Sequence, residues 1–299
     1  MYVASDPRSK LGASAKEGAK KSNAPAAPAT YARFYETGPD EAGNGYRTWF
    51  AGAANFIVAH SEVEDGAVLE RTEQPDEYVM LLPDAETSVT VEWDGGETVG
   101  GGHAIVIVPP GPSKVRFANG GRVVRLFTRR VGDIVEKCKV GHEDPHVPPL
   151  ESWPDPVGGY KVRWYSMDVP QEQGRFGRLI RSRDFMVNYI YPRPGPRDRK
   201  TLSPHSHDDF QQCSLCLEGT YVHHLRWRWG TNAEEWRPDD HETCGAPSVA
   251  VIPATVLHTS EAVGQGTNFL VDVFCPPRHD FSRQPGWVLN AAEYPQPQE

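Results

Sequence analysis

The sequence predicts an all-β protein built from two consecutive modules of short strands behind a flexible N-terminal tail. Its 299 residues include 27 prolines and 28 glycines, scattered among short runs rich in Val, Ile, Phe and Tyr. Frequent Pro and Gly residues between short apolar runs favour many short strands joined by turns over long helices. With 38% hydrophobic residues, the chain can bury one large core or two of medium size.

Residues 1–30 differ from the rest of the chain in composition. They are rich in Ala, Lys, Ser and Pro and contain few large apolar side chains, so burial cannot offset the entropy that is lost on ordering. We therefore expect a flexible tail. The tail lacks the apolar core of a secretory signal, and the five cysteines of the chain form an odd set. Together these features favour reduced thiols and a cytoplasmic location.

Strand-like runs alternate with turns on both sides of a Pro-rich passage. The first module, residues 31–140, contains ANFIVAHSEV, EYVMLLP, SVTVEW, HAIVIVPP and RVVRLFT. Residues 141–158 interrupt this alternation of strands and turns and are expected to form a linker or a crossover strap. The second module, residues 159–290, repeats the rhythm with FMVNYIYP, CSLCLEG, YVHHLRWRW, SVAVIP and NFLVDVFCPP. The two modules look like divergent copies of one fold.

Two histidines of the second module are spaced to share one face of a strand. In PHSHDDFQQCSLCLEG, His205 and His207 are two residues apart, so their side chains point to the same side. His258 follows a tight turn at Pro253 and can supply a third imidazole. Three imidazoles suit Fe, Mn, Ni, Cu or Zn, whereas Mg and Ca prefer oxygen ligands. The pattern predicts one divalent transition metal ion, bound by His205, His207, His258 and the amide oxygen of Gln212.

These motifs resemble the two signature motifs of the cupin superfamily. The resemblance rests on H-x-H, then Gln212 and Gly219, and later P-x-x-x-x-H. It implies two tandem cupin barrels, each a double-stranded β-helix or jelly roll. The usual fourth ligand in that family is glutamate, but the glutamine and the ending LVDVFCPPRHDF resemble small cupins that linearise unsaturated uronates. One extra residue between His207 and Gln212 leaves Gln211 as an alternative ligand.

The first module does not repeat the metal-binding residues. Lys114 lies five places after Pro109, where the second module has His258 five places after Pro253. Two positive and two negative groups at the matching positions can pair, but they cannot assemble a transition-metal shell. We therefore expect a degenerate, metal-free barrel whose buried charge network is either a packing relic or a site for a small polar effector. The matching positions are Arg71, Glu73, Glu77 and Lys114.

Further candidate residues follow Gly219 in the second module. Tyr221 and His223 lie at alternate positions, so they share one face of the expected strand. If that face points inward, they are acid or base groups beside the metal; if it does not, they only contribute packing. The inserted segment 226–243 alternates Arg and Trp and then turns back through acidic residues. It is expected to form either a lid or a homodimer interface. The interface is favoured, because Arg and Trp are enriched at protein–protein contacts.

The charge of the chain and of the predicted site restricts the function. The chain has 31 basic and 40 acidic residues, a net charge of -9, which argues against nucleic acids and anionic membranes as general partners. No segment approaches the roughly 20 apolar residues of a membrane span. The four predicted ligands are neutral, so a bound divalent ion keeps its full charge and favours a small anionic or enolisable substrate.

Three functions are consistent with these observations. The first is a mononuclear Fe(II) dioxygenase that cleaves a small oxygen-rich organic acid or enol, which the cupin resemblance favours slightly. The second is a metal-dependent isomerase, lyase or hydratase of sugar acids, in which Tyr221 or His223 moves protons. The third is a small-molecule binding or sensor protein, which the degenerate first module would suit.

Overall fold

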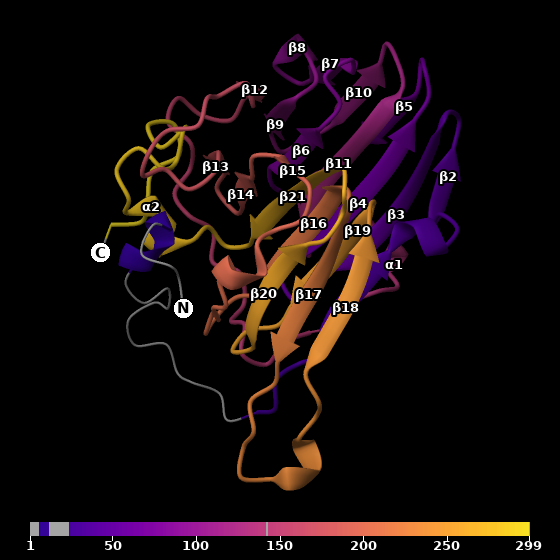
Figure 1. The fold of residues 1–299 in the computed structure, drawn as a ribbon. Coiled ribbons are helices and arrows are strands. Elements are labelled where there is room, and N and C mark those ends of the chain that lie inside the picture. Colours follow the sequence, from indigo (N-terminus) through magenta and orange to yellow (C-terminus); the bar gives the residue numbers. More distant parts are fainter. Residues whose placement is uncertain (1–5, 12–23, 142, 299) are drawn as a thin grey trace.

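The structure, a computed structural model, describes residues 6–11, 24–141 and 143–298 (Figure 1). Much of the predicted tail, residues 1–5 and 12–23, lies outside the described residues. Its described parts contact the second half of the chain. The 3-10 helix η1 (Pro7–Lys10) is followed by Leu11, which packs against a hydrophobic cluster of that half. None of the described helices is long and apolar enough to cross a membrane.

The first half folds into two antiparallel sheets. The larger has the strand order β12-β9-β6-β11-β4-β3-β2 and the smaller has the order β5-β10-β7-β8. Alternate residues of both sheets point into a shared hydrophobic core. The strands are β2 (Glu41–Gly43), β3 (Tyr46–Gly52), β4 (Phe56–Val63), β5 (Val68–Arg71), β6 (Tyr78–Leu82), β7 (Ser88–Trp93), β8 (Gly96–Gly101), β9 (Ala104–Val108), β10 (Ser113–Phe117), β11 (Gly121–Thr128) and β12 (Arg163–Ser166), and α1 (Gly132–Lys137) follows β11.

The second half also folds into two antiparallel sheets. The larger has the order β1-β19-β16-β21-β14-β13, with β15 paired to β21, and the smaller has the order β18-β17-β20. The strands are β1 (Thr30–Arg33), β13 (Leu179–Arg181), β14 (Met186–Tyr189), β15 (Arg193–Pro194), β16 (Gln212–Glu218), β17 (Thr220–Arg226), β18 (Asp240–Gly245), β19 (Ser248–Ile252), β20 (Leu257–Ala262) and β21 (Thr267–Phe274). The short helices are η2 (Phe34–Glu36), η3 (Arg199–Thr201), η4 (Ala233–Glu235) and α2 (His279–Ser282).

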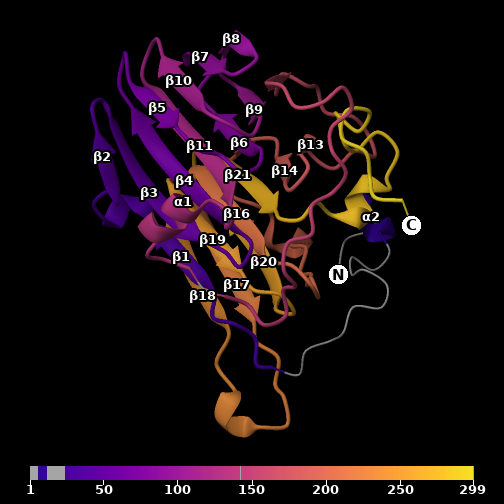
Figure 2. The same cartoon turned by 180° about the vertical axis from the view of Figure 1, so that it is seen from behind.

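The two larger sheets pack against each other and join the halves (Figures 1 and 2). Leu215, Val251 and Val271 of the second half lie in this shared core. Their sequence neighbours point the other way, into the interior of the second half, because strand residues alternate between faces. The interior face of the second half therefore carries polar side chains such as Ser214 and Asp272, both of which are buried.

Two strands each pair with a sheet of the other half, and not with the module in which the sequence placed them. β1 falls at the start of the predicted first module, yet it pairs with β19 of the second half. β12 falls in the predicted second module, yet it pairs with β9 of the first half. Each strand covers a sheet edge that would otherwise be open, which protects that edge from pairing with another chain. The linker predicted at 141–158 is also partly packed, since Trp153 is buried.

The charge network predicted for the first module does not form. The guanidinium of Arg71 pairs with Asp133, with its Nη1 at 2.6 Å from Oδ2. Lys114 is about half exposed and pairs with Glu70 at 3.0 Å. Glu73 is exposed. Spacing from a proline turn was not sufficient to predict which face of β10 each residue occupies, and the Lys114 side chain lies on the outer face.

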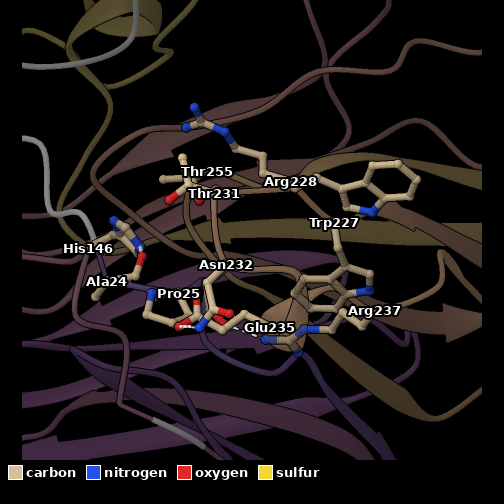
Figure 3. A pocket seen from close by; sticks show the side chains of 13 residues that line it. Ala24, Pro25, His146, Trp227, Arg228, Thr231, Asn232, Glu235, Arg237 and Thr255 are labelled. Atoms are coloured by element: carbon tan, nitrogen blue, oxygen red, sulfur yellow. Dashed lines mark hydrogen bonds between the residues drawn. The ribbon is translucent and has the colours of Figure 1, made fainter.

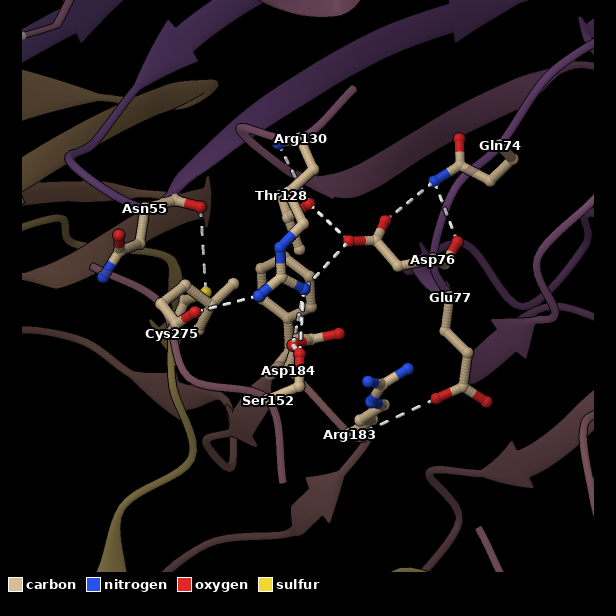
Figure 4. A network of polar contacts seen from close by, with 12 residues as sticks. Asn55, Gln74, Asp76, Glu77, Thr128, Arg130, Ser152, Arg183, Asp184 and Cys275 are labelled. Atoms are coloured by element: carbon tan, nitrogen blue, oxygen red, sulfur yellow. Dashed lines mark hydrogen bonds and ion pairs between the residues drawn. The ribbon is translucent and has the colours of Figure 1, made fainter. Parts of the chain in front are cut away.

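A buried polar network joins the halves at another place (Figure 4). Arg130 lies between two buried carboxylates, with Nη1 at 3.5 Å from Asp76 and at 3.4 Å from Asp184. Glu77 is 1% exposed and accepts a hydrogen bond of 2.7 Å from the hydroxyl of Tyr294. Burial raises the pKa of Glu77 to about 7, from an ordinary value of 4.5.

The raised pKa of Glu77 predicts a pH effect on stability. Between about pH 4.5 and 7 the folded protein holds a proton that the unfolded chain releases, so this group makes the free energy of unfolding fall as pH rises. The full effect is about 3 kcal/mol. Glu77→Gln should therefore be more stable than the wild type at pH 8 and similar to it at pH 4, as measured by urea unfolding.

A matched control for Glu77 is the exposed Glu73, four residues earlier. Glu73→Gln should leave the pH dependence of the free energy of unfolding unchanged. If Glu77→Gln shows the same stability loss between pH 4 and 8 as the wild type, Glu77 is charged in the folded protein and the argument fails.

Candidate metal centre

The three predicted histidine ligands meet at one end of the second half. His205 and His258 form an isolated antiparallel bridge, in which their backbone N–H groups and carbonyl oxygens bond at 3.0 and 2.8 Å. The ring centroid of His207 lies 5.0 Å from that of His205 and 5.3 Å from that of His258. One ring nitrogen of each residue lies within 4.8 Å of the others. The structure thus brings together groups that are about 50 residues apart in sequence.

Backbone carbonyl groups fix the orientation of two of these rings. The Nδ1 atom of His205 donates to the carbonyl oxygen of Ser203 at 2.8 Å. The Nδ1 atom of His258 donates to the carbonyl oxygen of Val256 at 2.9 Å. Burial lowers the pKa of His258 to about 4, so its ring is neutral near pH 7. With Nδ1 carrying the proton, Nε2 is the nitrogen of each ring that can bind a metal ion.

Gln212 turns its amide oxygen toward the imidazoles. Oε1 lies 3.1 Å from Nε2 of His207 and 3.4 Å from Nε2 of His258. The amide nitrogen donates to Ser214 Oγ and to Asp272 Oδ1, both at 3.1 Å. These two acceptors determine which end of the amide faces the site, because only the nitrogen can donate to them.

The spacing between His258 and Gln212 fits a cation bound in this site. With Nδ1 of His258 donating to Val256, Nε2 of His258 and Oε1 of Gln212 both present lone pairs at 3.4 Å, and a bound cation would be shared between them. Two ligands that bind one ion at about 2.1 Å lie roughly 3.0 to 3.4 Å apart in octahedral or tetrahedral geometry. The observed spacing and the neutral donor set fit a divalent transition metal ion.

The alternative ligand Gln211 is excluded by its position. Its Oε1 atom accepts a hydrogen bond of 2.6 Å from the backbone N–H of Ala54 in the first half. Gln211 therefore faces away from the histidines. The extra residue after His207 is accommodated in the turn before β16, so Gln212 still begins the strand and points into the interior.

Asp272 is a candidate site residue that the sequence analysis missed. It pairs with Ser214 in the sheet register, and its Oδ1 atom accepts hydrogen bonds from Ser214 Oγ at 3.0 Å and from the Gln212 amide. Burial raises the pKa of Asp272 to about 6. The available signal was a single acidic residue within the apolar run NFLVDVF, which is unusual for a strand that is buried on both faces.

An aromatic wall with a buried arginine borders His207. The imidazole of His207 stacks on Phe210 at a centroid distance of 4.4 Å and meets the edge of Phe274 at 6.2 Å. The guanidinium carbon of Arg278 lies 4.9 Å from the Phe274 ring centroid. Arg278 also pairs with Asp280, and both side chains are about 5% exposed. This wall holds the His207 ring in place, and the sequence pattern alone gave no indication of it.

Tyr221 and His223 both point into the interior of the second half, as their alternation allowed. Tyr221 is buried, and burial raises the pKa of its phenol. His223 is completely buried; its Nδ1 lies 2.9 Å from Ser260 Oγ, while Nε2 has no hydrogen-bond partner among the described residues. Neither residue hydrogen-bonds a predicted metal ligand in the described structure. Their catalytic role therefore stays a prediction.

The predicted insertion forms a hairpin that extends away from the body of the protein (Figures 1 and 2). Trp229 and Trp236 stack on it with ring centroids 4.4 Å apart, and both are exposed. A cavity of about 520 Å³ lies at its base, lined by residues that include Trp227 and Arg237 (Figure 3). The cavity reaches Thr255, whose N–H donates to the carbonyl of His207. No predicted metal ligand lines it, and its role as an interface stays a prediction.

Comparison with known proteins identifies the fold. No family model and no curated protein matches the chain. Among solved structures, AerE from Microcystis aeruginosa is similar at 10% identity, with 83% of this chain and 99% of that chain covered and a TM-score of 0.57. Oxalate decarboxylase from Lactobacillus farciminis, in a formate complex, is similar at 12% identity, 83% and 86% coverage and a TM-score of 0.55.

A variant of oxalate decarboxylase from Bacillus subtilis is also similar, at 12% identity, 86% and 81% coverage and a TM-score of 0.53. These likenesses show the fold of the chain. The predicted all-β class is confirmed, and the antiparallel sheets match those of these structures.

Proposed function

We propose that this chain is a metal-dependent enzyme that acts on a small, oxygen-rich organic acid. The observation that carries the proposal is the convergence of four neutral donor atoms, two of which are acceptors facing each other at 3.4 Å. The residues that would hold one divalent ion are His205, His207, His258 and Gln212. When bound, such an ion would act as a Lewis acid that stabilises negative charge on a carboxylate or enolate oxygen.

The residues of the chain favour proton-transfer chemistry at this site. Asp272 places a buried carboxyl group against Gln212, where it can accept a proton from a bound substrate. Tyr221 and His223 are further candidates for returning the proton at another atom. Such a transfer rearranges the substrate without an external oxidant. The proposed reaction is therefore the isomerisation, elimination or hydration of an acid.

Two structural relatives support an acid as the substrate and suggest a metal. Similar structures come from oxalate decarboxylases, one of them in a formate complex. The Mn(II) centres of the Bacillus subtilis enzyme are the subject of a further similar structure, with a TM-score of 0.51. Manganese is therefore the first metal to test, and iron is the second.

A dioxygenase that uses Fe(II) is the second candidate. The three imidazoles and the amide are all neutral, and this donor set leaves the iron with its full charge for a chelating enolate. Oxygen consumption distinguishes this candidate from the first.

The test is turnover by protein loaded with Mn(II) or Fe(II), with and without air, on unsaturated uronates, diketones and catechols. We expect conversion of an acid without oxygen uptake. Asp272→Asn should keep the metal and lower kcat by about a hundredfold or more. Oxygen uptake that matches turnover would support the dioxygenase instead. Metal binding without turnover of any compound would favour a binding or sensor protein.

A further inference from the structure

The interior of the first half contains one arginine that no described residue neutralises. Arg125 lies on β11 between Val123 and Phe127, and alternation turns all three side chains into the hydrophobic core of that half. In the sheet register Arg125 lies opposite Ala59 of β4 and Met80 of β6, which belong to the same core. Arg125 is 5% exposed. A permanently charged group is therefore held among apolar side chains.

The guanidinium donors of Arg125 are not used within the part of the chain that the structure describes. Its Nε atom is fully buried and has no hydrogen-bond partner there, and no described residue bonds or pairs with its two terminal nitrogens. Those two nitrogens are not fully buried, so a small molecule can reach them from the solvent. By contrast, the equally buried Arg163 donates to Glu293 and to two backbone carbonyl oxygens.

The charged groups that act on Arg125 are already paired with others. Arg71, the second buried arginine of this core, pairs with Asp133. Glu41 pairs with Lys137 at 3.1 Å. Because each of these pairs is neutral, Arg125 leaves the interior with one net positive charge. A buried charge without a partner is costly, and a bound anion would remove that cost.

Aromatic rings border the guanidinium group. Its carbon lies 5.4 Å from the ring centroid of Phe127, and the guanidinium carbon of Arg71 lies 5.6 Å from the same centroid. Tyr78 packs on Phe127 with centroids 5.3 Å apart, and its hydroxyl lies 3.1 Å from Ser113 Oγ. Burial raises the pKa of the Tyr78 phenol, and its hydrogen bond with Ser113 and the two guanidinium charges oppose this rise. Tyr78 therefore lies within reach of both charges.

We infer that Arg125 binds the carboxylate group of a small organic monoanion in the interior of the first half. The two terminal nitrogens of a guanidinium match the two oxygens of a carboxylate. The apolar side chains around Arg125 suit the hydrocarbon part of such a ligand. A single unpaired charge suits a monoanion better than a phosphate group. This site lies in the half that lacks the predicted metal ligands, and the inference does not depend on the proposed function.

The test is the affinity of the full chain for acetate, butyrate and phosphate, measured by titration calorimetry after a chelator has removed any metal. We expect both carboxylates to bind, and butyrate to bind more tightly because its alkyl chain contacts the apolar side chains. Arg125→Met should weaken binding by about tenfold to a hundredfold, the usual effect of losing a charged hydrogen bond. Arg125→Lys should lie between Arg125→Met and the wild type, because it keeps the charge but not the planar fork.

Urea unfolding gives a second readout. Without ligand, Arg125→Met should be at least as stable as the wild type, because it removes an unpaired buried charge and keeps a long side chain. Saturating butyrate should stabilise the wild type but not this variant. The matched control is Arg163→Met, which removes an equally buried arginine that pairs with Glu293. It should lose stability and keep the wild-type affinity for butyrate.

Three results would overturn the inference. The site is wrong if Arg125→Met binds the carboxylates as tightly as the wild type, or if the wild type binds neither. Phosphate binding as tight as that of butyrate would contradict the assignment to an organic monoanion. A loss of stability in Arg125→Met as large as that in Arg163→Met would show that Arg125 is satisfied by the protein itself.

Discussion

His207→Ala is expected to lose the metal ion while the protein stays folded. His207 is 3% exposed, and its Nε2 atom lies 3.1 Å from the Gln212 oxygen. Removing one of four donors should weaken metal binding by more than about a hundredfold, since even changes beyond the direct ligands cost 10 to 100-fold. The aromatic wall and the surrounding sheets remain to maintain the fold. Elemental analysis and circular dichroism of the same preparation measure both effects.

A matched control for this variant is another buried histidine of the same half. His223 is completely buried but hydrogen-bonds Ser260 rather than a predicted ligand. His223→Ala should therefore retain the metal, although it removes an imidazole of equal size. Full occupancy in His207→Ala would show that His207 is not a ligand. Loss of metal from both variants would point to general disruption of the second half.

Gln212→Glu is expected to move the affinity for metal and the affinity for an acid in opposite directions. The introduced carboxylate brings a negative charge onto the ion, which holds the metal more tightly and attracts an anion less. The structure adds a further effect, because the Gln212 amide nitrogen lies 3.1 Å from Asp272 Oδ1. Two carboxyl groups at that distance share a proton, so the pKa of Asp272 should rise further.

The expected result for Gln212→Glu is a metal dissociation constant about tenfold lower and an oxalate affinity at least about tenfold weaker. Adding Asp272→Asn to this variant should keep the tight metal binding, because the asparagine amide can donate to the introduced carboxylate. Gln211→Glu is the matched control, since Gln211 faces the first half. If Gln212→Glu changes neither affinity, Gln212 does not bind the metal.

The charge balance around Gln212 also explains why this position is a glutamine. Its amide group makes two kinds of contact. The oxygen faces the histidines, and the nitrogen donates hydrogen bonds to Asp272 and Ser214. A glutamate can fill only the first role, and it would repel the Asp272 carboxylate. The glutamine at this position is therefore coupled to the buried aspartate on the neighbouring strand.

Sequence analysis predicted the all-β class and the three histidines that the structure brings together. Short runs bounded by Pro and Gly predicted the strands, and the two-residue spacing of His205 and His207 placed both on one side. It could not choose between Gln211 and Gln212, because residue alternation cannot be counted across the turn at 208–211. Only the contact of Gln211 with Ala54, which is 157 residues away, resolves the choice.

Other features depended on contacts between distant segments that no local pattern specifies. One example is that β1 pairs with the second half and β12 with the first. A strand-like segment of sequence does not show which sheet edge it will cover. The approach of Arg8 to Ser203 spans 195 residues. The first-module charge network was wrong for a related reason, because matched spacing did not predict the face of the strand: Lys114 points outward from β10, whereas His258 of β20 is buried.

The central claim is that one ion binds at His205, His207, His258 and Gln212. The most direct test is an anomalous difference map from crystals of the metal-loaded protein, recorded at the absorption edge of the bound metal. We predict a single peak about 2.0 to 2.2 Å from the three imidazole Nε2 atoms and the amide oxygen. A peak elsewhere, or no peak in crystals of protein that binds one equivalent of metal in solution, would contradict the account.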